Sequence, residues 1–104
     1  MASFVVSPEA EEDLDRIWRY LLSEAGLATA NRIQSALLEA FAGLAESPGQ
    51  GHKRSDLTER NVLFYSVFQY MVVYRRAPVV EIVGVLHAKR NLERVLKGRL
   101  PKPE

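Results

Sequence analysis

Three apolar, β-branched and aromatic runs follow one another between residues 62 and 87, and very short links join them. The runs cover residues 62–67, 70–75 and 79–87, and the links are centred on Phe68-Gln69 and Ala77-Pro78. Strands joined by so few residues can pair only in antiparallel fashion, because a parallel pair needs a crossover of a dozen or more residues. The sequence therefore predicts an antiparallel β-meander in the second half of the chain.

The first half predicts a short strand and a helix. The strand-like run at residues 3–6 stops at Ser7-Pro8, where Ser7 can cap a helix and proline suits its first position. The acidic side chains that follow favour the positive end of a helix dipole. Apolar residues then recur every three or four positions as far as Gly26, namely Leu14, Ile17, Trp18, Leu21 and Ala25.

A second amphipathic helix is predicted over residues 29–46. Only residues 26–28 separate the two helices, so they should fold back on each other as an antiparallel hairpin. The run Ser-Pro-Gly-Gln-Gly at residues 47–51 ends the hairpin. Residues 52–60 are predicted to form a polar loop, and residues 88–99 a short C-terminal helix.

Together these elements predict one α+β domain over residues 1–104, in the order β-α-α-β-β-β-α. The helical hairpin should pack on one face of the antiparallel meander in two layers, and residues 97–104 should form a frayed tail. Strict alternation in the last strand would turn Val80, Ile82 and Leu86 toward the helices. It would leave Glu81 and His87 on a partly open sheet face, where we expect the functional surface.

Charge is divided unevenly along the chain, although the net charge is only +1. Residues 1–50 carry three basic and eight acidic side chains, whereas residues 51–104 carry eleven basic and five acidic ones. This split indicates a basic face for an acidic partner, or simply two acidic helices lying against a basic sheet. The chain has no cysteine, no signal peptide pattern and no apolar run of membrane-spanning length, so we expect a cytoplasmic protein.

Known catalytic, metal-binding and cofactor-binding motifs are absent from the sequence, and we expect no cofactor and no metal. His87 is the one residue that suggests catalysis. As a general acid or base assisted by Arg60 and Arg90, it could support metal-independent RNA cleavage. The alternative, which we favour, is that His87 orients the turn after the last strand through a backbone hydrogen bond.

The order and spacing of four segments resemble the RelE/ParE superfamily of type II toxin–antitoxin toxins, and most closely its ParE branch. The segments are SPEAEEDLDRIWRYL, LAESPGQGHKRSDL, FQYMVVYRR and VEIVGVLHAKRNLERVL. The resemblance covers residues 3 to about 97. The family fold agrees with the element order predicted above.

The resemblance implies a small toxin that a cognate antitoxin protein neutralises. ParE-type members poison DNA gyrase without being nucleases, and our candidate contact residues are Arg75, Arg76, Lys89, Arg90 and Arg94. RelE-type members instead cut mRNA on the ribosome, which would use His87 with Arg60 and Arg90. A third reading is a degenerate toxin that only binds its antitoxin. None of these readings implies sequence-specific DNA binding or a membrane partner.

Overall fold

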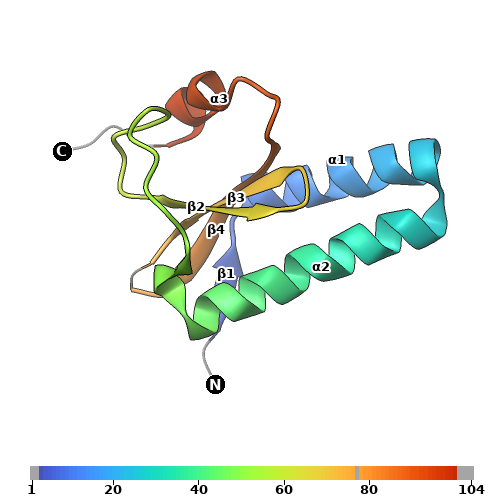
Figure 1. Ribbon diagram of the computed structural model, residues 1–104, viewed down its shortest axis with the longest axis horizontal. Helices are drawn as coiled ribbons and strands as arrows, with labels where there is room; N and C mark the ends of the chain where they lie inside the picture. The colour runs from blue at the N-terminus through green and yellow to red at the C-terminus, as the bar shows by residue number, and fades with distance from the viewer. Residues whose placement is uncertain (1–2, 77, 101–104) are drawn as a thin grey trace.

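The computed structural model describes residues 3–76 and 78–100 and contains the elements that the sequence predicts (Figure 1). In chain order they are β1 (Phe4–Val6), α1 (Pro8–Ala25), α2 (Leu27–Glu46), the 3-10 turn η1 (Pro48–Gln50), β2 (Leu63–Val67), β3 (Tyr70–Arg75), β4 (Val80–His87) and α3 (Leu92–Arg99). The predicted order and the α+β class are confirmed. No helix in this part of the chain is long and apolar enough to cross a membrane.

The helical hairpin forms without a loop. The side chain of Ser7 caps α1 by accepting a hydrogen bond from the Ala10 N–H at 3.1 Å. Gly26 ends α1 and begins α2 with a φ of 91°, a backbone conformation that a residue with a Cβ adopts only at a cost. A single glycine therefore turns the chain back on itself.

The sheet has the order β1-β4-β3-β2. The meander β2-β3-β4 pairs in antiparallel fashion as predicted, and Val67 faces Tyr70 across the two-residue turn. The sequence did not reveal that β1 would pair parallel to β4 and so make the sheet mixed. This pairing places the start of α1 beside the middle of β4, because the Ser7 N–H donates to the Ile82 carbonyl at 2.9 Å.

One face of the sheet packs on the hairpin of α1 and α2. Phe41 of α2 is fully buried there and meets Phe4 of β1 edge to face, with ring centroids 5.7 Å apart. The buried members of this core are Ala10, Leu21, Ala30, Ile33, Leu37, Phe41, Leu44, Leu63, Tyr70, Val72, Tyr74, Val80, Ile82 and Val85.

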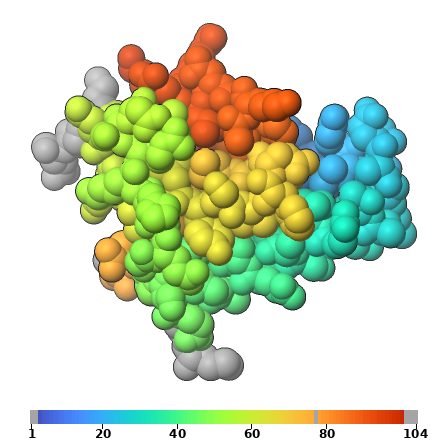
Figure 2. Space-filling view, viewed as in Figure 1, coloured from blue at the N-terminus to red at the C-terminus, as the bar shows by residue number. Residues whose placement is uncertain are grey.

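The opposite face of the sheet is covered, which corrects the expectation of a partly open functional surface. Helix α3 lies against it, and Figure 2 shows α3 seated beside the β2–β3 hairpin. The buried members of this second core are Val62, Phe64, Val73, Val83, Leu86, Leu92, Leu96 and Leu100. Residues 97–99 belong to α3 rather than to a frayed tail, and residues 101–104 lie outside the described residues.

A β-bulge changes which side chains of β4 face the helices. The register shifts between Val73 and Tyr74, which pair with Gly84 and Ile82, so Val83 is the extra residue. Val85 therefore joins the helix-side core, and Leu86 joins the α3-side core. The prediction by strict alternation was right for Val80 and Ile82 but wrong for Leu86.

Candidate partner-binding site at the end of β4

A cavity of about 330 Å³ lies between α1 and the end of the sheet where β3 begins and β4 ends. We call it the basic cavity. Its lining combines apolar and aromatic side chains with two arginines and a histidine. The lining residues are Asp13, Arg16, Ile17, Tyr20, Gln69, Tyr70, Val85, His87 and Arg90. A cavity of this size and mixed character is typical of a binding site.

His87 stands at the end of β4 and lines this cavity rather than an open sheet face. Its Nδ1 accepts a hydrogen bond from the Lys89 N–H at 3.1 Å, and its ring meets Tyr70 edge to face with centroids 5.6 Å apart. An Nδ1 that accepts carries no proton, so in neutral His87 the Nε2 is the donor. This is the turn-orienting role that the sequence left as the alternative to catalysis.

Tyr70 and Tyr20 form the aromatic part of the cavity. Both line the cavity, but Tyr70 is buried, whereas 61% of the surface of Tyr20 is exposed. Burial raises the pKa of the Tyr70 hydroxyl, and the neighbouring Tyr20 adds to the rise. The Tyr70 hydroxyl therefore keeps its proton at neutral pH, and its ring adds apolar surface to the cavity.

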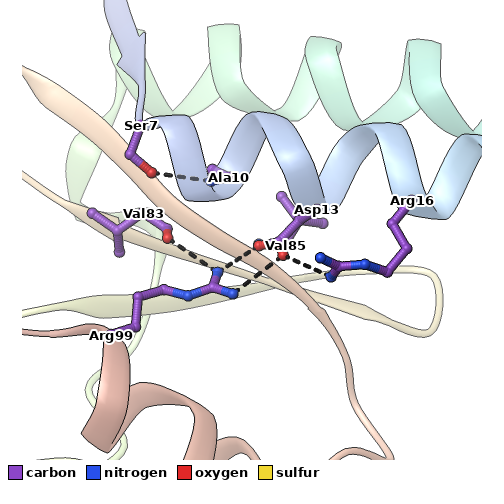
Figure 3. Close-up of polar contacts among 7 residues, drawn as sticks. All are labelled: Ser7, Ala10, Asp13, Arg16, Val83, Val85 and Arg99. Atoms are coloured by element: carbon purple, nitrogen blue, oxygen red, sulfur yellow. Dashed lines mark hydrogen bonds and ion pairs between the residues drawn. The ribbon is translucent and has the colours of Figure 1, made fainter.

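Asp13 is the only acid in the lining, and the protein satisfies it completely (Figure 3). Its carboxylate is 1% exposed and accepts hydrogen bonds from the Val85 N–H at 3.0 Å and from the Arg99 guanidinium at 2.6 and 3.3 Å. Arg99 also donates to the Val83 carbonyl at 3.4 Å. Ile82 is the last residue of β4 that pairs with β1. Beyond it, Asp13 and Arg99 bind the backbone groups of Val85 and Val83 that β1 leaves unpaired.

The positive charges of the two arginines in the cavity are largely available to a ligand, because their ion pairing within the described residues is weak or absent. Arg16 reaches Asp13 at only 3.4 Å, and 62% of its side chain is exposed. Arg90 lies exposed in the turn after β4, and within residues 3–76 and 78–100 no carboxylate forms an ion pair with it. Because Arg99 already balances Asp13, the cavity is net positive.

The five predicted partner-contact residues fall into two groups. Lys89, Arg90 and Arg94 are exposed after the end of β4: Arg90 lines the basic cavity, Lys89 precedes it in the turn, and Arg94 lies in the first turn of α3. Arg75 and Arg76 lie where β3 ends, opposite the start of β4, and Arg75 forms an ion pair with Glu81 at 3.1 Å. The two groups are separated by the length of β3, about 17 Å at the usual rise per residue.

The three residues of the nuclease hypothesis do not come together. His87 and Arg90 line the basic cavity, whereas Arg60 lines a different pocket with residues of the loop 55–59 and of α3. In the same loop, Arg54 is bound to Asp56 by two hydrogen bonds of 2.7 and 2.9 Å. These bonds hold the pKa of Asp56 below its usual range. They also pair the Arg54 guanidinium with a carboxylate, so its charge is balanced within the loop. In the described part of the chain no three His, Asp or Glu side chains gather to hold a metal ion.

Sequence reasoning missed Asp13, Arg16, Tyr20, Gln69 and Arg99 as members or supports of this site. Only Asp13 carries a signal in the sequence, because it occupies a position of the apolar face of α1 among otherwise hydrophobic residues. The others look like ordinary surface residues until the bulge and the hairpin bring them together.

Two comparisons with known proteins agree with this fold. The sequence matches the family described as "ParE toxin of type II toxin-antitoxin system, parDE" over residues 4–92. The structure is similar to one described as "Chromosomal ParDE TA system from P. aeruginosa", with a TM-score of 0.70 and 20% sequence identity, covering 84% of this chain and 96% of that one. A search of curated proteins finds no match.

The family match covers most of the chain, and it comes with the predicted element order. The chain belongs to the ParE toxin family of type II toxin–antitoxin systems.

Proposed function

We propose that this toxin inhibits DNA gyrase by binding it, without catalysing a reaction, and that a cognate antitoxin protein neutralises it in the cytoplasm. The observation that carries the proposal is the exposed group Lys89, Arg90 and Arg94, which projects from the turn after β4 and from α3. Of the ion pairs among the described residues, none involves these three side chains. An uncompensated basic group of this kind favours a contact with an acidic surface of a large partner.

The geometry gives less support to ribosome-dependent mRNA cleavage. To act as a general acid, His87 would need a proton on both ring nitrogens. A proton on Nδ1 would point at the Lys89 N–H and break the hydrogen bond that Nδ1 accepts from it. Arg60, the second residue of the hypothesis, lies in another pocket. His87→Ala should therefore leave toxicity largely intact, whereas loss of a general acid would lower a cleavage rate about 10²–10⁴-fold.

A supercoiling assay with purified protein and DNA gyrase tests the proposal, with in vitro translation run beside it on the same preparation. We expect supercoiling to stop and cleaved DNA to accumulate while translation continues. Arrested translation with cut mRNA and unaffected gyrase would replace the proposal with the nuclease reading. Inactivity in both assays, together with tight binding to the antitoxin, would identify a degenerate toxin.

A further inference from the structure

We propose that the basic cavity anchors one segment of the cognate antitoxin, and that this segment carries an apolar side chain next to an Asp or Glu. The inference rests on the proposed function for the identity of the partner. The cavity's own chemistry defines the segment, as the following paragraphs argue.

The apolar part of the cavity lining is where the apolar side chain of the segment would bind. Ile17, Tyr70 and Val85 give the cavity its apolar lining, and the exposed ring of Tyr20 stands beside them. A side chain of leucine or phenylalanine size would cover these groups and remove the Tyr20 ring from water. Apolar contact of this kind supplies most of the affinity at the centre of a protein interface.

The acidic side chain is required by the charges around this apolar surface. Two arginines line the cavity, Arg16 from α1 and Arg90 from the turn after β4. Each guanidinium can hold a carboxylate through two parallel hydrogen bonds. The Nε2–H of neutral His87 and the amide of Gln69 are additional donors in the same cavity.

The surroundings favour a short acidic peptide over a nucleic acid. Binding a nucleic acid depends on a row of phosphate contacts, and the cavity has only two arginines. The surface of α1 next to it also carries exposed carboxylates, at Glu9 and Glu12, one turn before Asp13 and Arg16. This surface would repel a long polyanion, whereas a single carboxylate enters without meeting it.

Seating the antitoxin here also explains how it would neutralise the toxin. Arg90 belongs both to the basic cavity and to the exposed group Lys89, Arg90 and Arg94 that we assign to the target. A segment bound in the cavity takes the Arg90 charge and covers the turn that carries Lys89. Antitoxin and target therefore compete for one end of the sheet.

A titration with two matched dipeptides tests the chemistry of the cavity. The ¹⁵N-labelled full chain is titrated with N-acetyl-Leu-Glu-amide and, separately, with N-acetyl-Leu-Gln-amide. We expect saturable shifts of the amide signals of Tyr20, Gln69, His87 and Arg90, with the Glu peptide binding at least about fivefold more tightly. Arg90→Gln should abolish the difference between the peptides, and Arg32→Gln, an exposed arginine of α2 outside the cavity, should leave it. Equal affinities in the wild-type chain, or shifts confined to other residues, would overturn the proposal.

Affinity for the antitoxin tests the identity of the occupant. The probe is the antitoxin whose co-expression suppresses growth arrest by this toxin. Tyr20→Ala and Arg90→Gln should each weaken its binding at least about tenfold, with Arg32→Gln as the control. If the antitoxin binds these variants as tightly as the wild type, the cavity proposal is overturned while the proposed function stands. If the wild-type chain inhibits neither gyrase nor growth, the proposed function fails, and the dipeptide titration alone decides the chemistry of the cavity.

Discussion

At the scale of single residues, the pair Asp13–Arg99 carries the largest expected effect on stability. Arg99→Ala would leave a carboxylate that is 1% exposed with only the Val85 N–H and the distant Arg16 as donors. Removing one partner of a buried ion pair typically costs about 3–5 kcal/mol. We expect a loss of that order in the free energy of unfolding, measured by urea denaturation.

Arg19→Ala is the matched control, because Arg19 also forms an ion pair, with Asp15 at 3.1 Å, but both side chains are exposed. An exposed pair contributes about 0–1 kcal/mol. The double variant Asp13→Asn, Arg99→Leu should recover part of the stability lost by Arg99→Ala, since it leaves no uncompensated buried charge. Equal costs for Arg99→Ala and Arg19→Ala would show that the buried pair has no special role.

Phe68 is a second residue at which the local structure works against stability. It has a φ of 54° in the two-residue turn between β2 and β3, and 61% of its surface is exposed. A left-handed conformation costs a residue with a Cβ about 1–2 kcal/mol, and glycine avoids this cost. Phe68→Gly should therefore raise the free energy of unfolding by about 1 kcal/mol. A lower value would mean that the Phe68 ring makes contacts worth more than the strain.

At the scale of elements, the connection from α2 to β2 depends on the small size of Gly51. Its N–H donates to the Tyr74 hydroxyl at 2.9 Å, and this hydroxyl donates to the Pro48 carbonyl at 2.7 Å. A Cβ on Gly51 would lie 2.6 Å from the Tyr74 hydroxyl oxygen and 3.0 Å from the Phe64 carbonyl oxygen. Gly51→Ala should thus destabilise the fold by about 1–3 kcal/mol, as overpacking does.

Gly43→Ala provides the control with the opposite sign. Gly43 lies within α2, and a Cβ there would meet no atom within 4 Å. Alanine in a helix is favoured over glycine by about 0.5–1 kcal/mol. Thermal unfolding of both variants should therefore show Tm values on opposite sides of the wild-type value, and a loss of stability in both would refute the packing argument for Gly51.

The elements also show how far sequence reasoning reaches. Local signals placed α1, α2 and the meander within two residues of their ends, because caps, glycine and periodicity act through near neighbours. The bulge at Val83 is a tertiary feature, in which one unpaired residue reverses the facing of Leu86. The role of Asp13 is equally a tertiary feature, since its partner Arg99 is 86 residues away along the chain.

At the scale of the whole molecule, two buried tyrosines give the fold a sensitivity to alkaline pH. Burial raises the pKa of the Tyr74 and Tyr70 hydroxyls above the ordinary value of about 10. The folded state therefore keeps protons that the unfolded state releases, so the stabilisation is complete below about pH 10 and is lost as the pH rises further. The free energy of unfolding in urea should therefore fall as the pH rises above about 10. A double variant with Tyr70→Phe and Tyr74→Phe should show a shallower fall, and an unchanged slope would contradict this assignment.

The two basic ends of the molecule allow the target contact to be located. Lys89→Gln with Arg94→Gln removes two positive charges from the turn after β4 and from α3. Arg75→Gln with Arg76→Gln removes two from the end of β3, and both double variants leave Arg90 in place. Arg75 already shares its charge with Glu81, whereas Lys89 and Arg94 lie outside every ion pair among the described residues. The first pair of substitutions should therefore raise the concentration for half-inhibition of gyrase about tenfold at low salt, and the second less than about threefold.

Because the lost attraction is electrostatic, the difference should shrink as salt is added. The reverse order would place the gyrase contact at the Arg75 end, away from the basic cavity, and an antitoxin segment in that cavity could then no longer neutralise the toxin by covering the contact.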